Sequence, residues 1–384
     1  MKSLPQPTDA GLLRDLDQLA QPRTSHPWAR LNAISPYYTM FPLSFPLQVL
    51  RGARPGWVLD PFCGRGTTNY AARVLGFPTV GVDVNPIAAA IAQAKLVSAT
   101  AEGVANRCRA ILASGEPRDV PEGAFWQACF HPRTLQDICR LREALAGAEA
   151  EEDVLLRALV LGVLHGPRNK GLPSYLSNQM PRTYATKPDA AVRFWRRKGL
   201  EPVYVNVLDV IERRARYLLA HLPAKVPGHI RLADSRALAP EDFAIRFRYV
   251  ITSPPYFGMK TYVSDHWLRN WFLGGPPHVD YASDPQLGRS SLPAFIEGLR
   301  EVWTRVSQVC EPGALLVVRF GAIPSYEVDP VEVLRASLRG TPWKERRLSD
   351  AGSASNGRRQ ADQFQFVRSR AALEVDLYAS LEEA

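Results

Sequence analysis

Two short segments of the sequence hold residues whose types and spacing suit chemistry. Residues 60–68 read Asp-Pro-Phe-Cys-Gly-Arg-Gly-Thr-Thr, and residues 252–256 read Thr-Ser-Pro-Pro-Tyr. The small residues Gly64 and Gly66 let the backbone approach a ligand closely, and a helix beginning after them offers free N–H groups. Asp83 follows about 20 positions later, where a carboxylate can accept hydrogen bonds from both hydroxyls of a ribose. The first segment therefore predicts a loop that binds a nucleoside-containing cofactor.

Two common nucleotide-binding loops fit the first segment less well. A dinucleotide-binding loop has the pattern G-x-G-x-x-G, but Asn69 stands where its third glycine would be. A P-loop is excluded, because no Gly-Lys-Ser or Gly-Lys-Thr follows the glycines. The segment instead resembles the S-adenosylmethionine loop of a methyltransferase, which implies S-adenosylmethionine as the cofactor.

The second segment suits methylation of an exocyclic amino group on a base. Such an amine is a poor nucleophile, because its lone pair is delocalised into the ring. Acceptors at Ser253 Oγ and the Pro254 carbonyl would favour a more tetrahedral nitrogen, and Pro254 and Pro255 pre-organise the loop. Tyr256 offers a flat face on which an extruded base can stack. The sequence lacks the Pro-Cys pair that C5-cytosine enzymes need, so in-line positioning carries the expected chemistry.

Hydrophobic patterning predicts the elements that position these segments. Short apolar runs indicate parallel strands at 57–60, 79–83, 230–234, 249–252 and 314–318. Helices are expected at 68–75 and 87–96. Period-two alternation at 363–367 and 373–378 favours an antiparallel edge hairpin. The region between the second and third strands is mostly helical in pattern, most clearly at 135–145, 154–164 and 203–219.

Both segments resemble motifs of the S-adenosylmethionine-dependent DNA amino-methyltransferases, the N4-cytosine and N6-adenine type. Residues 60–68 are similar to the family's Asp-Pro-Phe-Cys-Gly-Ser-Gly-Thr-Thr, with Arg65 in place of the usual Ser at a position we expect to face solvent. Val-Asp-Val-Asn-Pro at 82–86 resembles the second motif, and 38–42 resembles the motif that closes over the methionine end of the cofactor. The resemblance covers roughly 35–100 and 228–320 and leaves the helical region unmatched.

The resemblance implies a fold, a domain arrangement and two sets of site residues. The fold class is α/β: a Rossmann-like class I methyltransferase with a mostly parallel seven-stranded sheet, an antiparallel edge hairpin and a helical insertion. We expect a peripheral segment at 1–30, a discontinuous catalytic domain at 31–96 and 228–384, and a helical insertion at 97–227 as the candidate target-recognition region. The catalytic residues are Ser253, Pro254, Pro255 and Tyr256. The cofactor-binding residues are Asp60, Phe62, Gly64, Gly66, Thr67, Thr68, Asp83, Asn85, Asp234 and Phe41.

The identity of the target base follows less directly. In the family, Ser at the position of Ser253 is associated with N4-cytosine, whereas Asp or Asn is more often associated with N6-adenine. The expected activity is therefore methylation of N4 of cytosine in duplex DNA by base flipping and direct in-line transfer. Alternatives are N6-adenine, an RNA or protein substrate, and a non-catalytic DNA-binding module.

Two basic stretches are candidates for contact with DNA. One runs from 180 to 200, where aromatic residues are interleaved with cations, and the other from 353 to 370. Basic residues with aromatics suit phosphate contacts and base stacking. The candidates are Arg182, Lys187, Arg193, Arg196, Arg197, Lys198, Arg358 and Arg359. The alternatives are a solvated basic face and, for the helical insertion, a structural cap over the cofactor.

Composition is consistent with a protein that meets a polyanion in the cytosol. The chain has 384 residues and a formal net charge of +9. Its five cysteines are scattered and lack zinc-site spacing, which indicates reduced thiols and no metal. The start lacks a signal-peptide pattern, and no apolar run suits a membrane span. We expect a cytoplasmic protein of the prokaryotic cytosol or nucleoid, and the family implies a restriction endonuclease or another phage-defence system as a partner.

Overall fold

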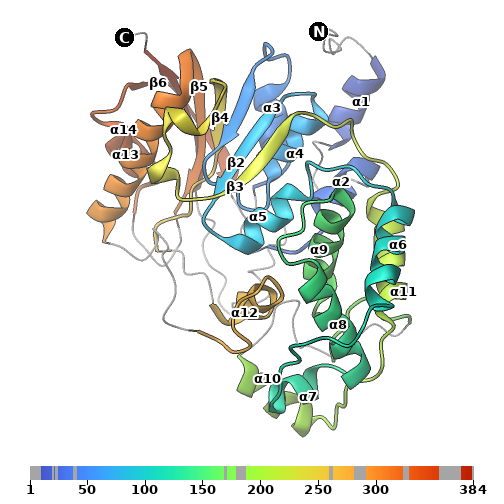
Figure 1. The fold of residues 1–384 in the computed structure, drawn as a ribbon. Coiled ribbons are helices and arrows are strands. Elements are labelled where there is room, and N and C mark those ends of the chain that lie inside the picture. The colour runs from blue at the N-terminus through green and yellow to red at the C-terminus, as the bar shows by residue number, and fades with distance from the viewer. Residues whose placement is uncertain are drawn as a thin grey trace.

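The computed structural model of the chain describes residues 10–19, 21, 25–37, 41–167, 171–178, 187–258, 263–280, 291–322, 328–353 and 373–382 (Figure 1). The strands are β1 (Trp57–Asp60), β2 (Thr79–Asp83), β3 (Gly228–Leu232), β4 (Phe247–Thr252), β5 (Cys310–Gly321), β6 (Trp343–Ser353) and β7 (Leu373–Leu381). The helices before β3 are α1 (Ala10–Leu19), α2 (Pro27–Asn32), α3 (Ser44–Leu50), α4 (Thr67–Val74), α5 (Pro86–Gln93), α6 (Ala101–Leu112), α7 (Ala124–Cys129), α8 (Pro132–Ala144), α9 (Glu151–Val163), α10 (Pro188–Arg197) and α11 (Val207–Leu218). After β3 come the short 3-10 helices η1 (Ser235–Ala237) and η2 (Pro240–Asp242) and the α-helices α12 (Val263–Phe272), α13 (Leu292–Val309) and α14 (Pro330–Leu338).

The described strands form one seven-stranded sheet in the order β3-β2-β1-β4-β5-β7-β6. Strands β3, β2, β1, β4 and β5 are parallel, whereas β7 runs antiparallel to β5 and to β6. This is the Rossmann-like class I methyltransferase fold that the sequence predicts. The edge hairpin differs in one strand, because β7 pairs with β6, which was not predicted, and residues 363–367 lie outside the described residues.

Both faces of the central sheet are covered by helices. In β1, Val58 packs with α3 and α4, whereas Leu59 packs with α13 and α14. Ile251 and Val250 of β4 divide between the two layers in the same way. Successive side chains of a strand point to opposite faces, so a continuous apolar run serves both layers.

The helices between β2 and β3 share a hydrophobic core with α4 and α5. Arg73 of α4, 1% exposed, joins both ends of this helical region to the sheet. Its guanidinium donates to the carbonyl oxygens of Lys95 and Val97 at one end and of Pro223 at the other, at 2.7–2.8 Å. Leu16 and Leu19 of α1 are buried in the same core.

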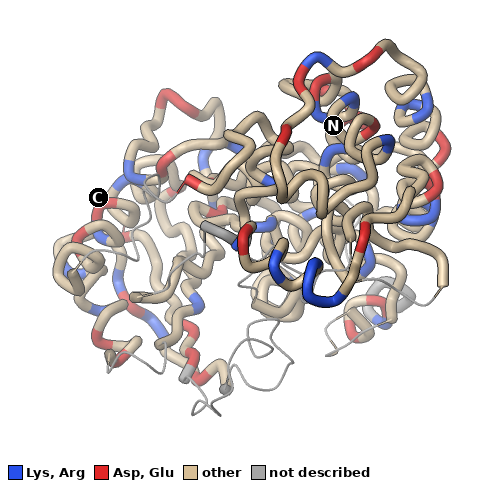
Figure 2. Tube along the Cα trace, turned by 90° about the horizontal axis from the view of Figure 1, so that it is seen from below, with Lys and Arg blue, Asp and Glu red and all other residues tan. Residues whose placement is uncertain are grey.

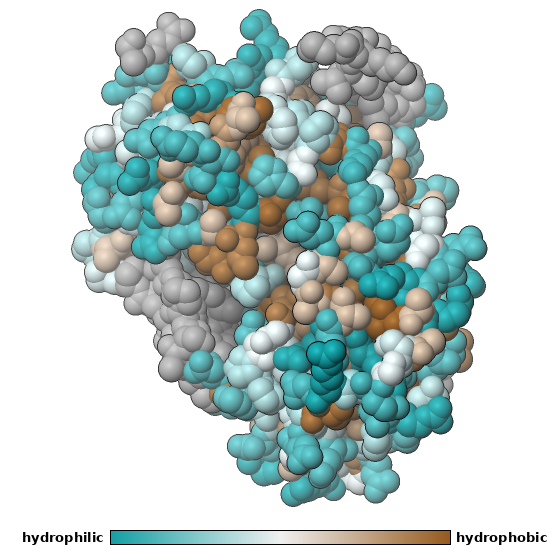
Figure 3. All heavy atoms as spheres, in the orientation of Figure 1, coloured by the Kyte–Doolittle hydropathy of each residue, from teal (hydrophilic) through white to brown (hydrophobic). Residues whose placement is uncertain are grey.

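Acidic and basic residues intermingle over most of the trace (Figure 2). In the orientation of Figure 1, the surface is mainly hydrophilic, with small hydrophobic groups between the polar residues (Figure 3). Within the described part of the chain, we find no helix whose length and apolar character would let it cross a membrane. The described cysteines are free and buried.

Candidate active site at the carboxyl edge of the sheet

Three neighbouring parallel strands bring the two predicted segments to one edge of the sheet. Strand β1 lies between β2 and β4, with Asp60 paired to Gly81 and Leu59 paired to Val250. The carboxyl ends of parallel strands meet at the same edge, which is where ligands bind in open α/β sheets. The loop after β1 and the loop after β4 are therefore neighbours, although the whole helical region between β2 and β3 separates them in the chain.

The glycine loop is packed tightly against α5. Gly66 has φ 76° and precedes the first residue of α4. A Cβ at Gly66 would lie 2.7 Å from Cβ of Ala92, so only glycine fits both the backbone conformation and the space. Thr67 and Thr68 begin α4 and are buried, and the Thr68 hydroxyl donates to the carbonyl of Ile251 on β4 at 3.2 Å. The cofactor loop is thus fastened to the strand that leads into the catalytic loop.

Asp83, at the end of β2, organises the loop through its carboxylate. The Gly64 N–H donates to Oδ2 at 2.8 Å, and the Asn85 N–H donates to Oδ1 at 2.8 Å. Asn85 in turn caps α5, since its side chain accepts from the Ile87 N–H at 2.9 Å. Burial raises the pKa of Asp83 to about 6, against the opposing effect of these backbone hydrogen bonds. Each carboxylate oxygen retains a lone pair that can accept from a ligand hydroxyl.

Asp60 connects the cofactor loop directly to the catalytic loop. Its side chain is fully buried, and Oδ1 accepts from the Thr252 hydroxyl at 2.6 Å and from the Phe62 N–H at 3.1 Å. Oδ2 has no hydrogen-bond partner among the described residues. Burial raises the pKa of Asp60 to about 6, while the Thr252 hydrogen bond opposes that rise. A buried carboxylate oxygen without a donor suits a cationic or hydrogen-bonding group of a ligand.

The predicted catalytic loop, which begins at Ser253, follows β4 directly. Pro254 is buried, whereas Ser253, Pro255 and Tyr256 are partly exposed. The Tyr256 hydroxyl donates to Oε1 of Glu374 on β7 at 2.8 Å. The loop therefore presents the Ser253 hydroxyl and the Tyr256 ring next to the glycine loop.

The remaining predicted cofactor residues lie around this edge. Phe62 makes an edge-to-face contact with Trp303 of α13, and Phe41 makes one with Phe45 of α3. Asp234, two residues after β3, pairs with Arg236 at 2.6 Å, and this hydrogen bond lowers the pKa of Asp234. Residues 38–40 lie outside the described residues.

The expectation that Arg65 faces solvent is wrong. Its side chain is 9% exposed, because the glycine loop is pressed against α5. Lys95, just after α5, is also fully buried, and its Nζ donates to Oδ1 of Asn32 at 2.8 Å. Burial and the neighbouring charge of Arg65 lower the pKa of Lys95 well below its ordinary value.

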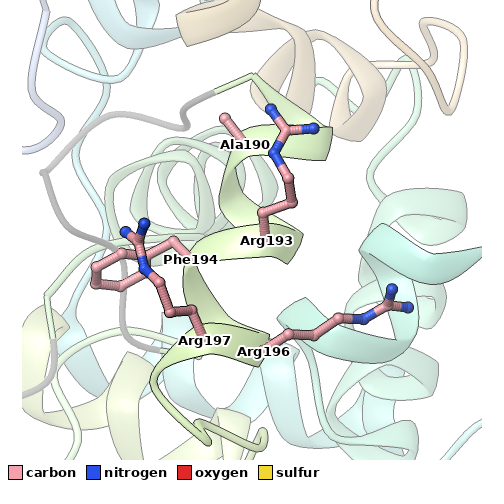
Figure 4. Close-up of a pocket in the computed structure, with 5 residues that line it drawn as sticks. All are labelled: Ala190, Arg193, Phe194, Arg196 and Arg197. Carbon is pink, nitrogen blue, oxygen red and sulfur yellow. The ribbon is translucent and has the colours of Figure 1, made fainter.

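Helix α10 contains most of the described DNA-binding candidates. Ala191, Val192 and Trp195 face the core, whereas Arg193, Arg196, Arg197 and Lys198 are exposed, as is Lys187, which precedes the helix. No carboxylate of the described residues forms an ion pair with these exposed side chains. Phe194, Ala190 and the three arginines line a depression (Figure 4). Arg182, Arg358 and Arg359 lie outside the described residues.

Sequence reasoning missed two residues that shape the site. Thr252 belongs to the predicted 252–256 segment, but the pattern assigns no role to its hydroxyl, which joins the two loops. Glu374 carried no sequence signal at all, because its partner Tyr256 is 118 residues away. Both roles arise from strand pairing, which local patterns do not reveal.

Comparisons with known proteins give only distant structural matches. No protein-family model matches the sequence, and no curated protein matches it. The solved structures include TrmN from Thermus thermophilus, with TM-score 0.36 and 10% identity over 92% of this chain and 52% of that one. They also include the rRNA methyltransferase AviRa from Streptomyces viridochromogenes, with TM-score 0.32 and 14% identity over 93% and 94% of the two chains. A SAM-dependent methyltransferase from Methanosarcina mazei gives TM-score 0.33 and 9% identity over 87% and 98%.

This chain has a class I methyltransferase fold. That assignment rests on the strand order and the antiparallel β7, because the three solved structures are only distantly similar to this chain. The chain spans about half the length of TrmN.

Proposed function

We propose that this chain is an S-adenosylmethionine-dependent methyltransferase that acts on N4 of cytosine in duplex DNA. One observation carries the proposal: the hydrogen bond from Thr252 to Asp60 joins a Ser-Pro-Pro-Tyr loop to a glycine loop at one sheet edge. A cofactor held by one loop and an amine held by the other would be adjacent. Binding both in a fixed geometry is the main requirement of a direct transfer.

The residues at this edge fit S-adenosylmethionine. Asp83 would accept from the ribose hydroxyls with the lone pairs that Gly64 and Asn85 leave free. The negative charge of the Asp60 carboxylate, which is enclosed in this structure, would attract the ammonium of the methionine end. Asp234 pairs with Arg236 in this structure. With the cofactor bound, it would instead accept a hydrogen bond from the adenine amino group. When bound, this cofactor supplies a methyl group on a positively charged sulfur, which is already a good leaving system.

The catalytic loop would prepare the amine. Ser253 Oγ and the Pro254 carbonyl accept its two N–H groups, which draws the nitrogen lone pair out of conjugation with the ring. The partly exposed Tyr256 ring stacks on the extruded base. A hydroxyl at Ser253, in place of a carboxylate, is the feature that favours cytosine over adenine.

Helix α10 supports DNA as the partner. Its exposed cations lack carboxylate partners among the described residues, so they are available for phosphates. Trp195 of α10 contacts Phe125, with ring centroids 5.8 Å apart, and Phe125 contacts Trp267 of α12 at 4.8 Å. Helix α12 follows the catalytic loop in the chain, so the basic face would be held in a fixed place relative to the reacting base.

The division into a catalytic domain and a target-recognition region, the cytoplasmic location and a restriction or phage-defence partner remain predictions.

The test is nucleoside analysis of plasmid DNA from cells that express the wild-type chain or Tyr256→Ala. N4-methylcytosine only with the wild type is the expected result. N6-methyladenine would keep the mechanism but reverse the base. Neither base, with cofactor binding intact, would contradict a DNA substrate and direct the search to RNA and protein.

A further inference from the structure

The ends of β5 and β7 form a seat for the Tyr256 side chain. Glu374 accepts the Tyr256 hydroxyl hydrogen at 2.8 Å. Phe320 meets the Tyr256 ring edge to face, with centroids 5.3 Å apart and planes at 71°. Gly321 is the direct partner of Glu374 in the β5–β7 ladder. The hydroxyl and the ring of Tyr256 are thus both held by the same pair of strands.

The seat leaves no room for a side chain at Gly321. A Cβ there would lie 2.9 Å from Cε2 of Tyr256 and 3.0 Å from Cγ of Glu374, closer than ordinary van der Waals contact. Gly321 is not among the glycines with positive φ, so the space and not the backbone conformation requires it. The Tyr256 ring therefore lies directly on the β5 backbone.

A buried ion pair lies next to the seat in the β5–β7 ladder. Arg319 and Asp376 face each other one step along the same side of the ladder and make two hydrogen bonds of 2.7 Å. The Arg319 guanidinium also lies 4.1 Å from the centre of the Phe45 ring. Burial opposes the charge of Arg319, but hydrogen bonding to Asp376 and the nearby Glu374 outweigh it and raise the Arg319 pKa. Glu374 thus lies near the charge of Arg319, whose guanidinium is held in place by Asp376.

We propose that Glu374 is a positioning residue, which holds the Tyr256 ring at the angle needed to stack on the target base. The inference rests on the proposed function, because it concerns the same reacting base. A side chain that is free to rotate must be ordered each time a base enters, whereas the Glu374 hydrogen bond orders it beforehand. Since that bond occupies the hydroxyl hydrogen, Tyr256 acts through its ring and not as a proton donor to the substrate.

A double-mutant cycle tests the proposal in the full chain. The variants are Glu374→Ala, Tyr256→Phe, their combination and Glu374→Gln, which keeps an acceptor oxygen. Methylation kinetics give kcat and KM, and 2-aminopurine at the target position reports the extruded base. Thermal melting and cofactor binding show that each variant is folded. Glu345→Ala, on the neighbouring strand β6, is a matched control, because Glu345 pairs with the exposed Arg335 and lies outside the seat.

The proposal predicts a coupled pattern. Glu374→Ala and Tyr256→Phe should each lower kcat/KM about tenfold, as expected for loss of a hydrogen bond to a charged group, and the double variant should be no worse than either. Glu374→Gln should recover most of the loss, and Glu345→Ala should match the wild type. Additive losses, or an unchanged Glu374→Ala in an active enzyme, would overturn this inference alone. A wild type that methylates no DNA base would overturn the proposed function and the stacking role together.

Discussion

The carboxyl edge of the sheet and the outer face of α10 place charge in opposite environments. At the sheet edge, Asp60 and Asp83 are carboxylates whose burial raises their pKa values to about 6. On α10, Arg193, Arg196 and Arg197 are exposed cations without carboxylate partners among the described residues. One region holds a few charges in fixed positions at a cost in desolvation, and the other presents several charges in water at little cost.

The difference indicates two kinds of ligand. Buried carboxylates with fixed hydrogen bonds recognise a small molecule whose donors match their lone pairs. Exposed arginines attract any polyanion over distances up to about a Debye length, ~10 Å at moderate salt, and they tolerate many sequences. The predictions below test whether the two regions act separately in this way.

The largest effect is expected at the buried edge. Asp60→Asn removes the charge that we propose attracts the cofactor ammonium while keeping an acceptor for Thr252, so cofactor affinity should fall at least about 100-fold. The melting temperature of the free protein should not fall, because ionisation of this buried group opposes folding. Calorimetric titration with S-adenosylmethionine measures the affinity. Asp350→Asn, on the exposed edge strand, serves as the control, and equal affinities for the two variants would remove Asp60 from the cofactor site.

Acid pH should weaken cofactor binding and stabilise the free fold. Both carboxylates have folded pKa values near 6, above their unfolded values, so the folded state takes up protons first as pH falls. Their contribution to stability is therefore fully present below the unfolded pKa and lost as pH rises through about 6. Between pH 7 and pH 5, affinity should drop by about tenfold for each carboxylate that must be ionised. Cofactor titrations and thermal melts at both pH values measure the two trends. If affinity and stability changed in the same direction, these carboxylates would not be the groups that bind the cofactor.

Loss of the arginines on α10 should weaken DNA binding without changing cofactor binding. Replacing Arg193, Arg196 and Arg197 together by Gln should raise the Kd for duplex DNA about 30-fold at low salt and reduce the slope of log Kd against log salt by about 3. Cofactor affinity and kcat at saturating DNA should be unchanged. The triple variant of Arg335, Arg346 and Arg347 removes the same charge from α14 and β6 and should bind like the wild type. Equal losses in both variants would mean that net charge, and not this face, attracts the DNA.

A smaller effect at Phe194 would show whether α10 also uses an aromatic contact. Phe194→Ala should raise the Kd for duplex DNA only about threefold, with no change in the salt slope, if the ring packs against sugar or base. Binding isotherms at two salt concentrations measure both quantities. An unchanged Kd would leave the face with charge contacts alone.

The sequence was sufficient for the five parallel strands and insufficient for the outer antiparallel strand β6. Strand 57–60 and the helix after it were predicted because a short apolar run and a glycine turn are local signals, and β1 and α4 lie there. The outer strand β6 was missed because its exposed, charged residues lack hydrophobic alternation. The same limit applies to the site: Asp60 and Asp83 end predicted strands, whereas the burial of Arg65 depends on how closely α5 covers the loop.

The bond between Thr252 and Asp60 joins residues 192 positions apart, and β2 pairs with β3 across the whole helical region. Such long-range pairings form slowly, whereas helices with local contacts form early. The helical region must therefore be largely assembled before β3 and β4 can complete the sheet. During refolding, helical content should appear ahead of cofactor binding, and a chain arrested after the helical region would hold the glycine loop but lack the partner strand that turns it into an enzyme.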